Sequence, residues 1–264
     1  MKASLKTALI QSPLAWENPE ANRTHFSKVL RDVSSDTDLI ILPEMFNTGF
    51  TMNPEHIARE EGPKTVDWMQ QKALETNTAI VGSLPFFENG SYTNRLFFVE
   101  PSGKIAQYDK RHTFTLAGED KVYRAGTEKL IVNFRGFKIC PMVCYDLRFP
   151  VWSRNTEDYD MLIYVANWPK PRITAWDTLL KARAIENMAY CIGVNRVGSD
   201  EVGHQYIGHS AVYDVLGEQI AFSEKEEIVY ATLSKEHITA TREKLKFLED
   251  RDHFELTTDL NPVS

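Results

Sequence analysis

The sequence alternates short, almost uninterrupted apolar runs with segments of helical periodicity, and this alternation limits the folds open to the chain. The runs at 5–11, 38–44 and 161–168 predict strands that are covered on both faces. Apolar residues recur at helical spacing over 63–76 and 175–189. Because strands joined by helices usually pair in parallel, the pattern predicts an α/β fold.

Hairpin signals lie between these units. The segment 95–110 indicates two strands around a Pro-Ser-Gly turn, and further hairpins are expected over 129–144 and around 214–219. Hairpins add antiparallel pairs to the parallel ones, so we expect mixed sheets. The sequence has no linker rich in Pro, Gly or Ser. A single domain over residues 1–264 is therefore predicted, with about 253–264 as a C-terminal tail.

The charge and hydropathy of the chain limit the classes of partner that we expect it to bind. The net charge is −7, which argues against nucleic acid, because binding there depends on Lys and Arg side chains that neutralise phosphates. No apolar run approaches the roughly 20 residues that a membrane span needs, and the apolar stretch near the N-terminus is too short for a signal peptide. We expect a cytoplasmic protein that binds neither nucleic acid nor membranes.

Three polar residues stand at the ends of predicted strands: Glu44, Lys110 and Cys144. In an α/β sheet, ligand chemistry gathers at the carboxyl ends of strands. A glutamate there can take a proton from a thiol, a lysine can stabilise an oxyanion, and a cysteine can attack an acyl carbon. Each residue alone is a weak signal, since most lysines are simply exposed. Together they are the parts of a cysteine acyl-transfer site.

The pair Cys140 and Cys144 has other interpretations. A zinc half-site needs further Cys or His ligands, and the third cysteine, Cys191, lies on a different predicted strand. A redox pair expects closer spacing at the start of a helix. We interpret Cys140 and Cys191 as small buried hydrophobic residues, and we expect no metal and no organic cofactor. If 140–144 form one strand, Cys140 and Cys144 point to the same face.

A family resemblance is carried by three segments, LPEMF (42–46), YDKRHTF (108–114) and CYDLRFP (144–150). In this order they resemble the signature segments of the nitrilase, or carbon–nitrogen hydrolase, superfamily. The stretch 167–198 is similar to later motifs of the same family, and the chain resembles its bacterial omega-amidase-like members most. The likeness extends from residue 5 to about residue 235. It implies a four-layer α-β-β-α sandwich with mixed sheets.

The resemblance also implies a site and a reaction. Glu44, Lys110 and Cys144 match the catalytic triad of the family, Glu119 matches its second glutamate, and the backbone N–H of Tyr145 would join Lys110 at the oxyanion. The implied reaction is hydrolysis of a small primary amide through a cysteine thioester, in a homodimer. An N-carbamoyl amidase, an acyltransferase that passes the thioester to an amine, and a non-catalytic binding member are the alternatives.

Omega-amidases act on amides whose far end is an α-keto carboxylate, such as 2-oxoglutaramate or 2-oxosuccinamate. Because an unpaired carboxylate is costly to bury, the pocket needs a cation or several N–H donors opposite the nucleophile. Arg172 is our candidate, since a guanidinium can bind a carboxylate with two parallel hydrogen bonds. A surface position for Arg172 is an equal alternative. We also assign Trp168, Asn167 and Phe114 to substrate binding.

Four further residues near these motifs receive structural interpretations. We expect Asp146 and Arg148 to pair with each other or with loop backbone. Glu186 is expected to pair with Arg183 or with the loop after the nucleophile. His112 lies beside Lys110, but we do not expect it to act as the base, because Lys110 and Glu44 already supply the proton chemistry.

The first prediction concerns the nucleophile. Cys144→Ala should abolish turnover and leave the fold intact, whereas Cys140→Ala should keep most of the activity, because only one thiol is expected to attack the substrate. Iodoacetamide should label Cys144 first, and substrate should protect it. Peptide mapping by mass spectrometry measures both effects. A Cys140→Ala variant as inactive as Cys144→Ala would contradict the single nucleophile.

Overall fold

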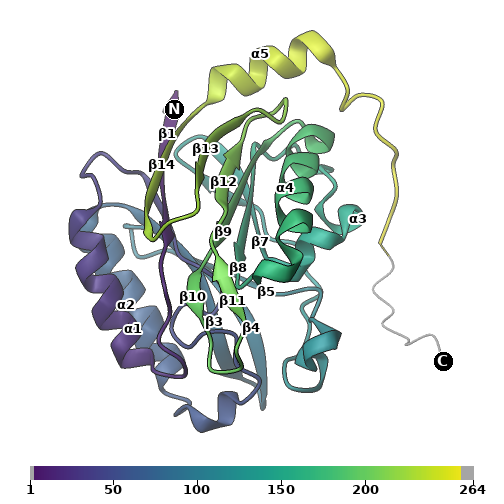
Figure 1. The fold of residues 1–264 in the computed structure, drawn as a ribbon. Helices are drawn as coiled ribbons and strands as arrows, with labels where there is room; N and C mark the ends of the chain where they lie inside the picture. Colours follow the sequence, from purple (N-terminus) through teal and green to yellow (C-terminus); the bar gives the residue numbers. More distant parts are fainter. Residues whose placement is uncertain (1–2, 257–264) are drawn as a thin grey trace, which may run out of the picture.

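The computed structural model describes residues 3–256, which form two six-stranded sheets packed face to face with helices outside them (Figure 1). The first sheet has the strand order β14-β1-β2-β3-β4-β5. Its central strands β1, β2 and β3 are parallel, and its other pairs are antiparallel. The bounds are β1 (Ser4–Gln11), β2 (Leu39–Ile41), β3 (Ala79–Glu88), β4 (Ser91–Val99), β5 (Ile105–Asp109) and β14 (Glu227–Ser234).

The second sheet repeats this plan in the order β13-β12-β9-β8-β7-β6. Strands β7, β8 and β9 are parallel, and the outer pairs are antiparallel. The predicted mixed sheets and α/β class are therefore confirmed. The bounds are β6 (Val132–Phe134), β7 (Phe137–Val143), β8 (Met161–Ala166), β9 (Tyr190–Asn195), β12 (Ser210–Tyr213) and β13 (Gln219–Ser223).

The apolar strands are continuous because each face of a sheet meets a different layer. In β2, Leu39 and Ile41 belong to the cluster between the sheets, whereas Ile40 packs with the helices α1 (Pro19–Val29) and α2 (Glu61–Thr76). Side chains alternate along a strand, so both faces must be apolar. On the far side, the second sheet is covered by α4 (Ile173–Asn187), as Figure 1 shows. The four layers match the predicted sandwich.

The sequence analysis did not predict the hairpin that β3 and β4 form. Strands β3 and β4 are joined at Asn89 and Gly90, which both have positive φ, of 51° and 79°. Asn-Gly is a strong hairpin signal, because both residues tolerate this conformation. Pro85 lies inside β3. Proline is tolerated there because β2 pairs with β3 only over residues 79–81, so that edge is free at Pro85.

The remaining elements lie at the edges. A small hairpin, β10 (Val197–Ser199) with β11 (Gln205–Ile207), forms a separate two-stranded sheet. The terminal helix α5 spans Lys235–Leu245 and crosses one end of the sandwich (Figure 1). The short helix α3 (Pro150–Ser153) lies near α4. Of the predicted tail at about 253–264, the part from 257 onward lies outside the described residues.

Across residues 3–256, no helix is both long enough and apolar enough to cross a membrane.

Candidate active site

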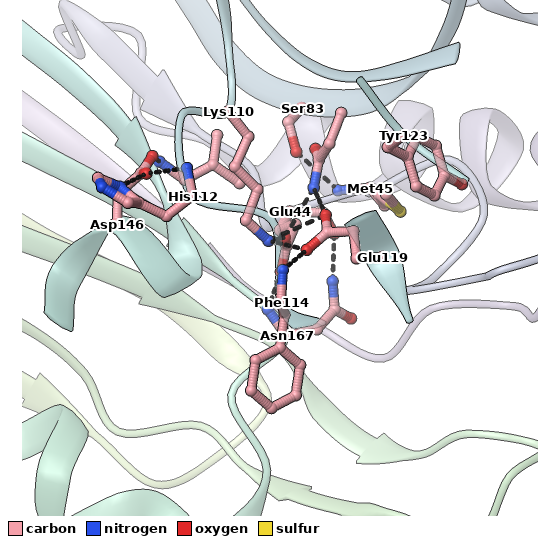
Figure 2. Close-up of polar contacts among 12 residues, drawn as sticks. Glu44, Met45, Ser83, Lys110, His112, Phe114, Glu119, Tyr123, Asp146 and Asn167 are labelled. Carbon is pink, nitrogen blue, oxygen red and sulfur yellow. Dashed lines mark hydrogen bonds and ion pairs between the residues drawn. The ribbon is translucent and has the colours of Figure 1, made fainter. Parts of the chain in front are cut away.

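The site lies where strand ends from the two sheets meet. Glu44 follows β2 and Lys110 directly follows β5, both in the first sheet. Cys144 directly follows β7 and Asn167 directly follows β8, both in the second. Figure 2 shows Glu44, Lys110 and Asn167 joined by polar contacts. The packing of one sheet on the other therefore assembles the site.

Lys110 is buried between two carboxylates. Its Nζ lies 2.9 Å from Glu44 Oε1 and 2.8 Å from Glu119 Oε2 (Figure 2). The side chain of Lys110 is 1% exposed, and both glutamates are fully buried. Burial alone would lower the pKa of Lys110, but the charges of Glu119 and Glu44 outweigh it and raise the pKa above its ordinary value. Lys110 is therefore an ammonium ion at neutral pH.

The two glutamates are held by further donors. Asn94 donates from Nδ2 to Glu44 at 2.8 Å and to Glu119 at 3.1 Å. Glu119 also accepts from the backbone N–H of Phe114, and Glu44 Oε2 accepts from the backbone N–H of Asn167 at 2.9 Å. Burial raises the pKa of Glu119, although Lys110 opposes the shift. Both carboxylates thus have fixed orientations.

Asn94 was missed by sequence reasoning. It lies in the middle of β4, between Thr93 and Arg95, and is fully buried. An amide at such a position is costly unless it is hydrogen-bonded, so its presence in a buried strand was an available signal. Its partners could not be inferred, because Glu44 is 50 residues away in the sequence.

Cys144 occupies a tight turn. The strand ends at Val143, and Cys144 begins a 3₁₀ helix, Cys144–Arg148, with φ of +44°. The alternation of side chains therefore stops one residue before Cys144, so the shared face with Cys140 is not formed by strand geometry. A non-glycine residue in this conformation costs about 1–2 kcal/mol. The turn also leaves the Tyr145 N–H in the first helical turn, where N–H groups have no partner within the helix.

The thiol of Cys144 is neutral at rest. Burial raises its pKa well above the ordinary value, the charge of Glu44 adds to this, and Lys110 opposes both. The charge of Lys110 favours the thiolate, but this is the smaller effect. The proton must leave Cys144 as the sulfur attacks, and the carboxylate of Glu44, whose charge acts on the thiol, can accept it.

A cavity of about 380 Å³ opens over Cys144. Its wall includes all four residues that the sequence assigned to substrate binding, and it also includes Lys110 and Tyr145. The assigned residues are Phe114, Asn167, Trp168 and Arg172.

Two guanidinium groups face this cavity. Arg172 lies 5.1 Å from the ring centre of Phe114, and Arg148 lies 4.9 Å from that of Trp168. Within the described part of the chain, neither guanidinium has a carboxylate partner. Of the two expected arrangements, Asp146 takes the second: it does not pair with Arg148, and it accepts from backbone N–H groups, including that of His112 in the loop after β5. Arg148 is left free to face the cavity.

The structure also shows the partners of Glu186 and His112. Arg183 pairs with Glu186 at 3.0 Å, as predicted, and also donates to the backbone carbonyl of Leu147 in the turn after the nucleophile. His112 places Nδ1 2.8 Å from Asp146 and stacks on Phe149. The Nδ1 atom of His112 therefore contacts Asp146 and not the thiol.

Known proteins resemble this chain along nearly its whole length. A family model described as carbon–nitrogen hydrolase matches residues 6–243. An omega-amidase of Yersinia enterocolitica, YafV, is 46% identical over 96% of this chain and 98% of its own. A 2-oxoglutaramate amidase of Bacillus subtilis is 31% identical over 91% and 95%. The crystal structure of a CN-hydrolase superfamily protein from Xanthomonas campestris, with an arsenic adduct in its active site, superimposes with a TM-score of 0.94 at 39% identity, covering 97% of this chain and 100% of that one.

The second prediction separates the structural and catalytic roles of Lys110. Lys110→Met should abolish turnover and lower the free energy of unfolding by about 3–5 kcal/mol, because it leaves two buried carboxylates without a cation. Adding Glu119→Gln should recover part of the stability without restoring activity. Urea denaturation and an ammonia-release assay measure the two effects. A Lys110→Met variant as stable as the wild type would contradict the ionised network.

Proposed function

Because this chain belongs to the carbon–nitrogen hydrolase family, we propose that it is an omega-amidase that hydrolyses the primary amide of a small α-keto acid. The substrates of this proposal are 2-oxoglutaramate and 2-oxosuccinamate. The products are a dicarboxylate and ammonia, and the reaction proceeds through a thioester on Cys144.

The observation that carries the substrate is the cavity with two unpaired guanidinium groups. Arg172 and Arg148 line the same cavity as Cys144. A substrate whose carboxylate binds to them can therefore place its amide group, at the other end of the molecule, next to the sulfur. Aromatic faces hold both guanidiniums without neutralising them. The relatives named omega-amidase and 2-oxoglutaramate amidase support the same substrate class.

The mechanism uses the geometry of the buried network. Glu44 takes the proton of Cys144 as the sulfur attacks the amide carbon. The oxyanion is bound by the Lys110 ammonium and the Tyr145 N–H, and one such donor is typically worth about 3 kcal/mol. Glu44 then gives its proton to the leaving ammonia. It next activates a water molecule, which cleaves the thioester and frees the thiol.

Glu119 acts through Lys110 in this proposal. Both of its oxygens lie within 3.0 Å of Nζ, so the ammonium cannot swing away as charge develops on the substrate. The surrounding donors keep the carboxylate fixed. The oxyanion site is thus formed before substrate binds, which avoids reorganisation during the reaction.

The third prediction tests the carboxylate contact. Arg172→Met should raise KM for 2-oxoglutaramate by roughly ten- to a thousandfold, since a hydrogen bond to a charged group is worth about 1.5–3 kcal/mol and two are lost. Hydrolysis of hexanamide, which has no carboxylate, should change far less. Ammonia release from both amides measures the difference. Equal losses on both substrates would remove Arg172 from the site.

The same assay separates the alternative functions. An N-carbamoyl amidase would release carbon dioxide together with ammonia from a carbamoyl substrate, and an acyltransferase would form a new amide when an amine is added. Mass spectrometry of the products distinguishes all three. A wild-type enzyme that leaves 2-oxoglutaramate intact but uses one of these substrates would replace the omega-amidase proposal.

We further propose that the protein is a cytoplasmic homodimer. The three cysteines Cys140, Cys144 and Cys191 are all free thiols, which suits a reducing compartment. Apolar side chains are exposed on the side of the molecule that carries α3 and α4, where Val151 is 53% and Ile185 48% exposed. Burial of such a patch against a second copy would be favourable.

The fourth prediction is the mass in solution. Light scattering at micromolar protein should give about twice the 30.3 kDa of the monomer. Ile185→Glu should shift the mass towards the monomer, because it places a charge within the proposed interface. Leu74→Glu is the matched control, since Leu74 is 71% exposed on α2, on the opposite side of the molecule. A wild-type protein with the mass of one chain would count against the dimer.

A further inference from the structure

Asp146 is a fully buried carboxylate that accepts four hydrogen bonds. Oδ1 accepts from the backbone N–H of His112 at 2.9 Å and lies 2.8 Å from its Nδ1. Oδ2 accepts from the Tyr108 hydroxyl at 2.7 Å and from the backbone N–H of Val143 at 3.1 Å. No lysine or arginine side chain is paired with it in residues 3–256. Hydrogen bonds from neutral groups and His112 therefore compensate for the loss of water.

The donors come from two segments that carry catalytic side chains. Tyr108 and His112 stand two residues before and two residues after Lys110. Val143 directly precedes Cys144. One carboxylate thus bonds to both flanks of the lysine and to the residue before the nucleophile. Figure 2 shows Asp146 and His112 beside Lys110.

The surrounding contacts make this connection rigid. Burial and the charge of Asp146 raise the pKa of Tyr108, so its hydroxyl remains a donor. That hydroxyl also accepts from Trp152 Nε1 at 3.0 Å. His112 stacks on Phe149 with ring centres 3.7 Å apart. A side chain held on all its oxygens by such groups cannot relax without moving the two segments.

The turn at Cys144 depends on this rigid support. Its positive φ is unfavourable for a residue with a Cβ atom, so other contacts must hold it. Asp146 lies two residues later in the same 3₁₀ helix, and its bond to the Val143 N–H closes the turn. This turn also orients the Tyr145 N–H.

We infer that Asp146 is a positioning residue that sets the placement of Lys110 relative to Cys144. It touches neither the substrate nor the reacting atoms. It fixes the two oxyanion donors against the sulfur by joining the end of β5 to the start of the nucleophile turn. The inference rests on the proposed amide hydrolysis, in which Lys110 and the Tyr145 N–H bind the same oxygen.

The matched comparison is between two buried aspartates. Asp146→Asn keeps the shape but turns an NH₂ group toward one pair of donors. Asp160→Asn is the control, because Asp160 is 2% exposed, accepts from the backbone N–H of Lys138 and pairs with Lys235 at the start of α5, outside the cavity. Thermal melts, kcat and KM for 2-oxoglutaramate, and the pH dependence of Cys144 alkylation by iodoacetamide are measured for both.

Asp146→Asn should lower kcat by about ten- to a hundredfold, since a misplacement near 1 Å costs this much, and should change KM by less than about twofold. Its alkylation profile should shift to higher pH, because a displaced Lys110 favours the thiolate less. Asp160→Asn should lower the melting temperature and leave kcat and the profile unchanged. A folded Asp146→Asn with wild-type kcat and profile would overturn the inference, as would equal kcat losses in the two variants.

A second variant decides the matter if Asp146→Asn does not fold. Tyr108→Phe removes one of the four bonds and keeps the ring, so it should lower kcat severalfold and shift the alkylation profile in the same direction. Wild-type values in Tyr108→Phe would then overturn the inference. Alkylation needs no substrate, so a wild-type protein inactive on 2-oxoglutaramate would refute the proposed function while leaving the positioning role of Asp146 under test.

Discussion

The ammonium of Lys110 between Glu44 and Glu119 is the interaction on which the rest of the site depends. Three charges in a protein interior are tolerable only when each has a close partner and further hydrogen bonds. Asn94 and Asn167 supply those bonds, and Asn167 directly follows β8 of the second sheet. The contacts that compensate for buried charge are therefore also contacts that align one sheet with the other. The same hydrogen bonds thus stabilise the fold and orient the proposed catalytic groups.

Much of the fold followed from local patterns in the sequence. Apolar runs such as 38–44 and 161–168 are strands because both of their faces meet apolar layers, and that requirement is visible without a structure. The family resemblance, confirmed by the family model, supplied the sandwich and the triad. Glu44, Lys110 and Cys144 could be singled out because each follows a strand. Their catalytic roles remain predictions.

The rest depended on contacts between distant segments. Asp146 was expected to pair with Arg148, two residues away, or with loop backbone, but its side-chain partner Tyr108 is 38 residues away. Asn94 could be recognised as an unusual buried amide, yet nothing local pointed to Glu44. The turn at Cys144 also lacks a sequence signal, since positive φ normally favours glycine. A single sequence records residue types well and their distant partners poorly.

The raised pKa of the Cys144 thiol also affects how readily this sulfur is oxidised. Peroxides oxidise thiolates far more readily than thiols, so a buried sulfur that keeps its proton is a poor target between turnovers. The other cysteines, Cys140 and Cys191, are fully buried, and burial raises the pKa of each thiol. A raised thiol pKa therefore slows oxidation at each sulfur, and Cys144 differs from the other two in having Glu44 and the cavity beside it.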